Sequence, residues 1–599
     1  MKKLHYIIMS LCMIQFSIIF TSCESYLDKS PDSDISEKDA FGNFQSFQGF
    51  VEQMYNLIQD PDKGQAWNLC LFADETLGPR PYAFDQGNYW GSENYFYGKS
   101  ASPTSTDPRS KRVWENAWYG IRVANLALAK LEEEGLFIGT EEERNHLKGQ
   151  ALFFRGWFYF EICRFWGGMP YIQKVIDPVE DMFSEEYNRL NYQETALKMV
   201  EDFRAAADIL PDHWDLSEPG QATKGHNRDR INKFHALGYL GKAYLFAASP
   251  MMNEEATGKN EFNQELCTKA AEAFGELLKL ADDTGIYKMQ AWENRTDCFW
   301  RWNFERPGGT ECIMMPTVYD RIRVRWSTIG AMVPSSLALN SGNSADVPTH
   351  NFVKNYAMAN GLPIDDPESG YNPNDPWTNR EPRFYQDILF DGCQIWSAEG
   401  EDKYAQLYTG GRHRSMINPP SVTGYYYKKF VPMGPEFNAS KADKMLCYKP
   451  YLRLADIYLM YAEALNFSES GGPKASASNY SMTAEDAINV VRNRAQLPDI
   501  SEKYTISKEV FFEEIVRERA VELSFEGERF DDLRRWNRNY DPRYLEKTAI
   551  DFDRDSNGKP INLKERVVIK RDVSKKHNWL PIQTKYTTMY AGFPQNPGW

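Results

Sequence analysis

Apolar residues recur with the period of an α-helix along much of this chain, and the segments that show this period follow one another in pairs. Glycine and proline end them where a helix should stop, as at Gly167, Gly168 and Pro170. A helix with one apolar face must bury that face against a neighbour. The pattern therefore predicts a mainly α-helical scaffold, with helices over 44–59, 111–133, 141–166, 194–209, 231–249, 262–282, 451–466, 484–495 and 508–525.

Two of these helices have the residue spacing of the first helix of a tetratricopeptide repeat. They read Leu237-x2-Leu240-Gly241-x2-Tyr244 and Tyr451-x2-Leu454-Ala455-x2-Tyr458. In this spacing the small residue lets a neighbouring helix approach closely. The helices that follow supply the partner faces Ala270-x3-Phe274 and Ala487-x3-Val491. Chance spacing in amphipathic helices is the alternative, and long insertions break the usual period of about 34 residues. We therefore expect interrupted helix pairs rather than a regular solenoid.

The helical period fails between residues 291 and 449. Short aromatic or β-branched runs, such as "CIMMPTVYD" and "YYYKKFVP", alternate there with turn signals such as Asn360-Gly361. We expect a loop-rich insertion with a few short strands that sits on the helices. No low-complexity linker divides the chain, which favours one body over 41–599. That body would comprise a helical scaffold at 41–290 and 450–540, the insertion at 291–449 and an irregular C-terminal segment at 541–599.

The N-terminus has the pattern of a processing signal. Two lysines precede an apolar run from Ile7 to Phe20, which is too short for a membrane span of about 20 residues. Small residues then lead to Cys23, as in the cleavage box of a bacterial lipoprotein. We therefore predict a signal peptide at 1–22, lipidation at Cys23 and a flexible polar tether at 23–40. An ordinary cleaved signal followed by a chance cysteine is the alternative.

Charge and cysteine content argue against several functions. A net charge of −15 and a pI near 5.3 disfavour nucleic acid and polyanionic ligands, and they tilt the ligand towards neutral molecules. Of the nine cysteines, Cys12 and Cys23 lie in the N-terminal segment. The others are far apart without a CxxC pair, which argues against a disulfide framework or a zinc site. The chain has no GxxxxGK[ST] phosphate loop and no GxSxG elbow.

One segment near the C-terminus has some features of a calcium-binding loop. Asp553, Asp555 and Asn557 alternate before Gly558, but Lys564 stands where the bidentate glutamate belongs. We therefore predict an Asn-Gly hairpin turn there and no cofactor, with bound calcium as the weaker alternative.

The segment "FEGERFDDLRRW", residues 525–536, concentrates charge among bulky apolar residues. Glu518, Glu522 and Glu526 recur every four residues before it, and arginines follow Gly527. Ion pairs and capping of a helix end explain this mixture. Carboxylates for glycoside hydrolysis would have to flank a cleft about 5–10 Å apart, and nothing in the sequence places such a pair. We interpret the segment as the charged rim of a helix end, without catalytic residues.

Two loop regions have the residue types that are expected to bind a ligand. Trp and Tyr rings stack on the apolar faces of sugars, while polar side chains bind hydroxyl groups. The stretches "GPRPYAFDQGNYWGSENYFYG" and "AWENRTDCFWRWNFERPGG" with "VYDRIRVRW" combine both kinds of residue. The candidate ligand-binding residues are Arg80, Tyr89, Trp90, Asn94, Tyr95, Trp292, Tyr319 and Trp326.

Four further segments read "ALFFRGWFYFEICRFWGGMP", "YLRLADIYLMYAEALN", "AINVVRNRAQLP" and "RERAVELSFEGERFDDLRRW". In this order, behind a lipoprotein-like N-terminus, they resemble the SusD/RagB family of surface glycan-binding lipoproteins of Bacteroidetes, although Asp456 replaces the usual Glu. The resemblance implies a scaffold of tetratricopeptide-like helix pairs, no catalysis and anchoring at the outer-membrane surface. It also implies a partner, a TonB-dependent SusC-like transporter that the protein covers as a lid.

The sequence thus favours a cell-surface protein that binds oligo- or polysaccharide and delivers it to a transporter. Two alternatives from other classes stay open: a secreted glycan-degrading hydrolase, and a tetratricopeptide scaffold that binds only protein. The sequence does not identify the glycan.

Overall fold

The computed structural model describes residues 36–58, 69–78, 84–89, 113–177, 181, 184–316, 346–395, 403–416, 420–431 and 445–599. The expected signal peptide at 1–22 and the expected lipidation site at Cys23 lie outside these residues. Within the described ranges, none of the helices combines the length and the hydropathy that a bilayer-spanning segment requires.

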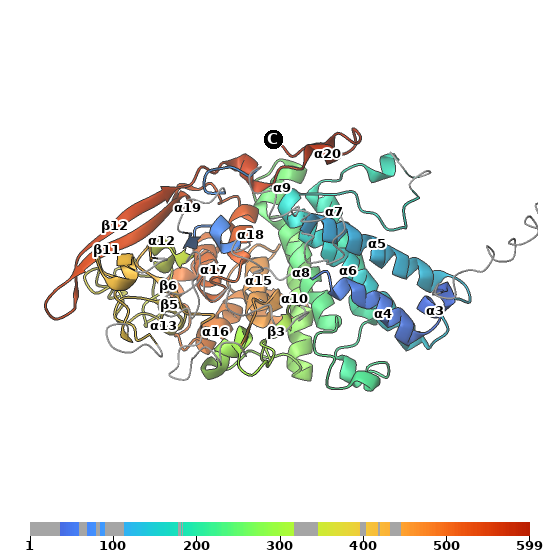
Figure 1. Ribbon diagram of the computed structural model, residues 1–599, viewed down its shortest axis with the longest axis horizontal. Coiled ribbons are helices and arrows are strands. Elements are labelled where there is room, and N and C mark those ends of the chain that lie inside the picture. The colour runs from blue at the N-terminus through green and yellow to red at the C-terminus, as the bar shows by residue number, and fades with distance from the viewer. Residues whose placement is uncertain are drawn as a thin grey trace, which may run out of the picture.

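The expected helices form, with ends close to the predicted ones, and successive helices pack side by side (Figure 1). The N-terminal group comprises α3 (Glu37–Phe41), α4 (Phe44–Tyr55), α5 (Val113–Glu132), α6 (Glu141–Trp166), α7 (Tyr192–Ile209), α8 (Lys233–Ala248), α9 (Pro250–Thr257) and α10 (Gln264–Thr284). The second group comprises α15 (Leu454–Asn466), α16 (Ala484–Arg494), α17 (Lys508–Glu522) and α18 (Glu528–Arg535). Helix α10 packs on both α8 and α15 and so joins the two groups.

Small residues set the spacing inside the helix pairs. A Cβ atom at Gly241 in α8 would lie 2.4 Å from the ring of Phe274 in α10, so only glycine permits this approach. A Cβ atom at Gly156 in α6 would lie 3.0 Å from the ring of Phe203 in α7. Gly241 and Phe274 belong to the spacing that predicted a tetratricopeptide-like pair, and their contact confirms that interpretation.

Helix α3 begins inside the expected tether. The Ser36 hydroxyl accepts from the backbone N–H of Asp39 (3.2 Å), and the Asp39 carboxylate accepts from the backbone N–H of Ser36 (3.1 Å). This capping box satisfies two of the free donors of a helix start. The expectation of a flexible tether over 23–40 therefore reaches too far, and the helical scaffold starts at Glu37.

The insertion has little regular structure, as expected, and its strands form two-stranded antiparallel pairs: β1 with β4, β2 with β7, β3 with β8, and β5 with β6. Two of these pairs connect the insertion to the chain on either side of it. The elements of the insertion, together with η1, β1 and β8 on either side of it, are η1 (Leu69–Phe72), β1 (Thr76–Leu77), η8 (Trp292–Cys298), β2 (Trp300–Arg301), β3 (Cys312–Met314), β4 (Val347–Pro348), α12 (His350–Val353), α13 (Pro382–Asp387), β5 (Ile388–Leu389), η10 (Arg412–Met416), β6 (Tyr426–Tyr427), β7 (Leu446–Cys447) and β8 (Leu452–Arg453).

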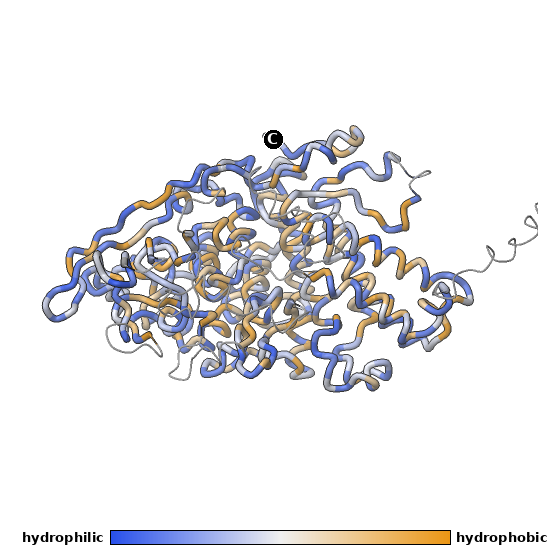
Figure 2. The backbone as a smooth tube through the Cα atoms, viewed as in Figure 1, coloured by the Kyte–Doolittle hydropathy of each residue, from blue (hydrophilic) through white to orange (hydrophobic). Residues whose placement is uncertain are grey.

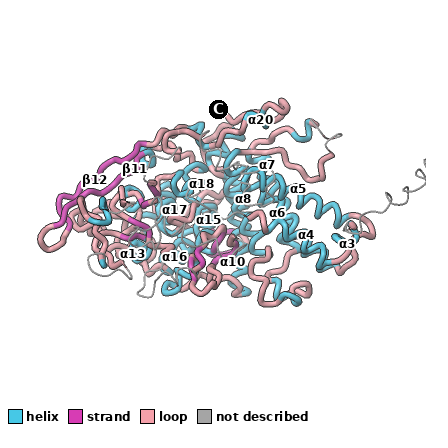
Figure 3. The backbone as a smooth tube through the Cα atoms, in the orientation of Figure 1, coloured by secondary structure: helices cyan, strands magenta, loops and turns pink. Residues whose placement is uncertain are grey.

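Two hydrophobic cores meet along α17. Ile515 and Val516 belong to the core of the helical scaffold, whereas Ala520 and Val521, one turn later, belong to the core of the insertion. Hydrophobic stretches concentrate along the central helices, and many peripheral loops are hydrophilic (Figure 2). Helices fill the centre and one half of the molecule, whereas loops and strands dominate the other end (Figure 3).

The C-terminal segment is not uniformly irregular, contrary to the expectation for 541–599. After α19 (Pro542–Leu545) it forms a long hairpin of β11 (Glu546–Arg554) and β12 (Pro560–Lys570). The tight turn confirms the Asn-Gly prediction: Gly558 has a φ of +78°, and the Asp555 carboxylate accepts from the backbone N–H groups of Asn557 and Lys559. The rest contains only η12 (Lys575–Asn578) and α20 (Thr584–Thr587).

The hairpin projects from the loop-rich end of the molecule (Figure 1). Strand β11 lies against the body, and four successive residues from Lys547 to Ile550 are buried. Strand β12 is the outer strand of this two-stranded sheet and is exposed along most of its length. Its central residues are Lys564, Glu565 and Arg566.

Candidate ligand-binding pocket

A pocket of about 390 Å³ opens where the insertion meets the helical scaffold. It draws on four segments: the start of η8, the turn before Gly361, helix α13 with the residues before it, and the residues after α16. This volume lies near the lower end of the range for small-molecule sites, about 300–1,000 Å³. The lining residues are Trp292, Ala359, Arg380, Pro382, Tyr385, Gln386 and Gln496.

Two aromatic side chains line the pocket. Trp292 is half-buried, and Tyr385 is 36% exposed. The Tyr385 hydroxyl donates to the carbonyl of Trp377 (2.7 Å) and accepts from the backbone N–H of Arg380 (3.1 Å), so it is held while the residue stays accessible. Rings held in place in this way can stack on the apolar face of a ligand.

Arg380 is a charged member of the lining, but four of its five side-chain donors are already used. Its guanidinium donates to the backbone carbonyls of Val353, Tyr356, Ala357 and Pro376 at 2.6–3.3 Å. Burial lowers the pKa of this guanidinium. Arg380 therefore fixes the turn at 357–361 against α13, and with 4% of its surface exposed it offers little of its charge to a ligand.

The pocket wall formed by α13 is tied to η8 by ionic contacts. Arg295 donates to the carboxylate of Asp387 (2.7 Å) and to the side-chain oxygen of Gln386 (3.0 Å). Glu381, the N-cap residue of α13, accepts from the backbone N–H of Ala357 (2.6 Å). Each of these contacts joins two different walls, so the lining is preorganised before any ligand enters.

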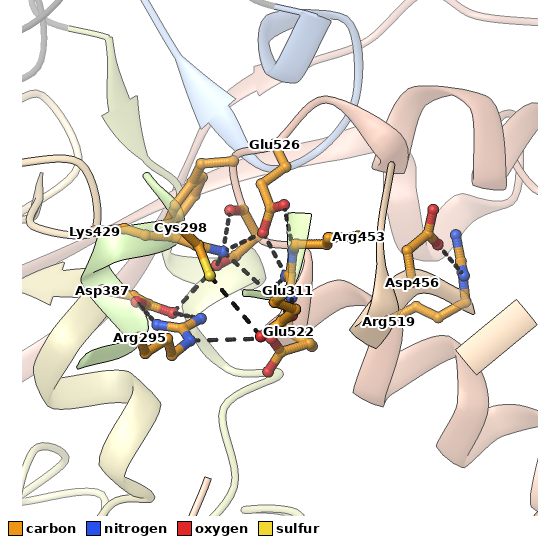
Figure 4. Close-up of polar contacts among 12 residues, drawn as sticks. Arg295, Cys298, Glu311, Asp387, Lys429, Arg453, Asp456, Arg519, Glu522 and Glu526 are labelled. Atoms are coloured by element: carbon orange, nitrogen blue, oxygen red, sulfur yellow. Dashed lines mark hydrogen bonds and ion pairs between the residues drawn. The ribbon is translucent and has the colours of Figure 1, made fainter. Parts of the chain in front are cut away.

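Beneath α13 lies a network of buried ion pairs in which Glu522 is central (Figure 4). Its carboxylate accepts from Arg453 Nη1 (2.9 Å), from Arg383 Nη1 (3.1 Å) and from Arg494. Burial alone would raise the pKa of Glu522, but the guanidiniums of Arg494, Arg295, Arg453 and Arg383 hold that pKa well below its usual range.

The network extends in both directions from Glu522. Arg453 also pairs with Glu311 (2.7 Å) and Glu526 (2.7 Å), and Lys429 pairs with Glu526 (2.7 Å). These groups come from the insertion, from β8 and from the end of α17, so the ion pairs seat the insertion on the helical scaffold. Such pairs are stable in the interior only when each charge is compensated.

The segment 525–536 is therefore not a rim. Its charged residues pair as expected, but they are buried: Arg519 bridges Asp532 (2.8 Å) and Asp456 (2.9 Å), and Arg535 pairs with Asp532 (2.8 Å). Arg534 donates to the carbonyl of Arg164 (2.8 Å), a C-terminal carbonyl of α6. The expected capping thus occurs, but against a different helix and in the interior.

Of the expected ligand-binding residues, Trp292 lines the pocket. Tyr89 does not reach it: its side chain is 2% exposed and packs on His577 (ring centroids 4.7 Å apart) and on Trp599 (5.9 Å). Its ring packs with the C-terminal segment and not in this pocket, so a role of Tyr89 in ligand binding stays a prediction. The others lie outside the described residues and stay predictions: Arg80, Trp90, Asn94, Tyr95, Tyr319 and Trp326.

Sequence reasoning missed Tyr385, Gln386 and Gln496. Tyr385 and Gln386 are neighbours in α13, whereas Gln496 follows α16 more than a hundred residues later, and neither amide carries a motif. One signal was available for Tyr385, because it lies in the loop-rich insertion and loops on a rigid scaffold often carry binding residues.

A second hollow of about 350 Å³ lies between α5, the loop before α7 and the α20 segment. Its lining is almost entirely apolar and includes Trp114, Trp118, Tyr586 and Phe593. The described residues contain no group of three or more side chains suited to hold a metal. The described cysteines are free thiols, buried except for half-buried Cys393, as small apolar groups would be.

Comparison with known proteins identifies relatives over most of the chain. A model described as the SusD family matches residues 319–599, and a model described as starch-binding associating with outer membrane matches residues 25–245. A SusD-like protein of Bacteroides ovatus is 24% identical over 550 residues, which cover 87% of this chain and 81% of the relative.

Solved structures share the fold. A SusD-like protein from Bacteroides fragilis NCTC 9343 aligns with 95% of this chain and 100% of its own, at 20% identity and a TM-score of 0.67. A SusD-like carbohydrate-binding protein from the same organism aligns over 92% and 98%, at 18% identity and a TM-score of 0.63. These structures confirm the expected scaffold of interrupted helix pairs.

Proposed function

We propose, from the premise that the chain belongs to the SusD/RagB family of carbohydrate-binding proteins associated with the outer membrane, that it captures oligosaccharides at the cell surface and delivers them to a TonB-dependent SusC-like transporter. It binds its ligand without cleaving it. Cys23 carries the lipid that anchors it.

One observation supports the ligand assignment most directly: Trp292 and Tyr385 line a pocket together with the amides of Gln386 and Gln496. Aromatic rings and amides are the groups that bind the apolar faces and the hydroxyls of a sugar. Among the described residues, the lining includes no carboxylate that could act as a general acid or nucleophile, whereas glycoside hydrolysis generally needs two.

Binding to polysaccharides tests this function. We expect the purified full-length protein to bind at least one glycan of a polysaccharide panel, and no new reducing ends to appear over hours. Trp292→Ala should weaken that binding by about tenfold or more, which corresponds to about 1.4 kcal/mol.

Trp118→Ala is the matched control, since Trp118 is also half-buried but lines the second hollow. It should leave glycan affinity unchanged. Binding that survives Trp292→Ala would remove the pocket as the site, and release of reducing ends would make the protein an enzyme.

The anchor and the partner have their own test. Cys23→Ser should move the protein from the outer-membrane fraction to the soluble fraction. The native protein should copurify with an outer-membrane transporter in mild detergent. Retention of Cys23→Ser in the membrane, or purification without any transporter, would contradict this part of the proposal.

A further inference from the structure

Arg295 determines which face the Gln386 amide shows to the pocket. Arg295 Nη1 lies 3.0 Å from Gln386 Oε1. A guanidinium has only donors, so the amide atom that faces it must be the oxygen. The amide nitrogen is thereby left to the pocket, which Gln386 lines. Gln386 therefore offers a ligand hydrogen-bond donors rather than an acceptor.

This orientation is rigid because Arg295 is itself fixed. Its guanidinium contacts both carboxylate oxygens of Asp387, at 2.7 and 3.3 Å, and lies 3.9 Å from Glu522. Arg295 is 1% exposed, and Asp387 is 0% exposed. The buried network thus sets the polarity of one wall of the pocket.

Gln496 reaches the pocket from a backbone conformation that suits glycine. Its φ is +61°, just after α16 ends, where glycine is the usual residue. A side chain in this region strains the backbone. The Gln496 side chain is exposed and lines the pocket, so its packing contributes little stability to offset the backbone strain.

The position of Gln496 is nevertheless well defined. Arg492 donates to the carbonyl of Pro498 (3.0 Å) and to the carbonyl of Gly361 (3.1 Å). It thereby holds the residues after α16 against the turn that contains Ala359. The two glutamines are consequently held by different segments of one lining.

The lining as a whole offers little net charge to a ligand. Arg380 is 4% exposed and uses four of its five side-chain donors on carbonyls, and Arg295 is balanced by Asp387. Among the described lining residues, the accessible polar and aromatic groups that remain are two rings and two amides.

We propose that Gln386 and Gln496 are the specificity-determining residues of this pocket and that its ligand is an uncharged saccharide whose hydroxyl or ring oxygens accept from their amides. The proposal rests on the proposed function of the pocket.

Substitution of Gln386 tests the donor assignment. In Gln386→Glu both side-chain oxygens are acceptors, one pairs with Arg295, and the donor towards the ligand is lost. We expect the affinity for the bound neutral glycan to fall at least about tenfold, and Gln386→Met to reduce it similarly. Both variants should keep the far-UV circular dichroism of the wild type.

Substitution of Gln496 separates binding from folding. Gln496→Gly relieves the backbone strain, so the melting temperature should rise slightly while the affinity falls at least about threefold. Asn562→Gly is the control, because Asn562 also has a positive φ (+57°) but lies on β12. It should raise the melting temperature without any effect on binding. A purely structural Gln496 would give the same result as Asn562.

The ligand class is tested by comparing neutral gluco-, xylo-, manno- and galacto-oligosaccharides with oligogalacturonides. We expect binding of a neutral series that changes less than about twofold between 50 and 500 mM NaCl, because no ionic contact is screened. Preference for oligogalacturonides overturns the inference. If Trp292→Ala abolishes binding but the glutamine variants bind normally, the inference fails and the proposed function stands. If Trp292→Ala has no effect, both fail.

Discussion

Two buried contacts of the molecule are held together by different forces. One is the stack, the contact between paired helices of the scaffold, and the other is the seat, the contact between the insertion and α17. In the stack, α8 and α10 meet through an apolar contact between Gly241 and the ring of Phe274. Where the insertion meets α17, the apolar contacts of Ala520 and Val521 are joined by several ion pairs around Glu522. Both contacts are buried, but only the second is densely charged.

The difference explains why the pocket lies where it does. Apolar contacts are non-directional, so a stack of helices tolerates small shifts of one helix against another. Charge-assisted hydrogen bonds demand a defined distance and angle. The α13 wall of the pocket stands on such bonds, and its side chains are therefore placed more precisely than apolar packing alone would place them.

The largest change in stability is expected when the carboxylate charge of Glu522 is removed. In Glu522→Gln, four guanidiniums lose their shared carboxylate. We expect the free energy of unfolding to fall by about 3–5 kcal/mol, the usual result of breaking a buried ion pair on one side. Denaturant unfolding at neutral pH measures it.

Glu513→Gln, on an exposed face of the same helix, is the control. Glu513 pairs with Arg538 and Arg543 in solvent, so this change should cost less than about 1 kcal/mol. Equal losses of unfolding free energy at the two positions would show that the buried ion pairs around Glu522 contribute no more than ion pairs at the surface.

A smaller effect is expected in the stack. Gly241→Ala places a methyl group 2.4 Å from the Phe274 ring, which should cost about 1–3 kcal/mol. The second change Phe274→Leu should recover part of this loss, because apolar contacts accept a new shape of similar total volume.

Gly49→Ala in α4 is the control, since a Cβ atom there meets nothing within 4 Å. It should stabilise the protein by up to about 1 kcal/mol, as alanine is the better helix former. If Phe274→Leu recovers none of the stability lost in Gly241→Ala, the apolar contact between α8 and α10 requires as exact a geometry as the ion pairs around Glu522.

An effect that appears only at high pH concerns the buried carboxyl of Glu75, which forms no ion pair with the residues that the structure describes. Arg529 pairs with Asp74 (3.0 Å), and burial raises the pKa of neighbouring Glu75 from 4.5 to about 7. Because the folded-state pKa lies above the unfolded one, the stability that Glu75 contributes is complete below pH 4.5 and is lost as the pH rises towards 7.

Glu75→Gln mimics the protonated acid at every pH. It should therefore stabilise the protein by up to about 3 kcal/mol at pH 8 and have no effect at pH 4, given about 1.4 kcal/mol for each unit of the pKa shift. Thermal unfolding at the two pH values measures the difference. A variant less stable than the wild type at pH 8 would show that Glu75 is ionised and compensated, like Glu522.

Local features of the fold could be predicted from the sequence. The helical period of α6 and α10, the Gly241 spacing and the Asn557-Gly558 turn each depend on neighbours within a few residues. The short strands of the insertion were expected in kind but not in pairing. The hairpin strands were missed because β12 alternates weakly, with three charged residues at its centre.

The site could be predicted only in part, because its partners are distant in sequence. Arg383 and Glu522 are 139 residues apart, so no local pattern indicates that their charges meet in the interior. Trp292 was found from its residue type. Gln496 was not, since its positive φ is set by the end of α16 and is not evident from a glutamine in the sequence.

The outer strand β12 has a consequence for how copies of this molecule meet. Among the described strands β12 pairs only with β11, so its eleven residues, seven of them exposed, offer an outer edge of roughly 36 Å on which another strand could form a ladder. Two identical strands that pair antiparallel about a two-fold axis place the residue on that axis opposite its own copy. With Lys564, Glu565 or Arg566 on the axis, like charges face each other, which opposes pairing. These charges thus disfavour pairing of β12 with the β12 of a second copy. A strand of different sequence could still pair with this edge.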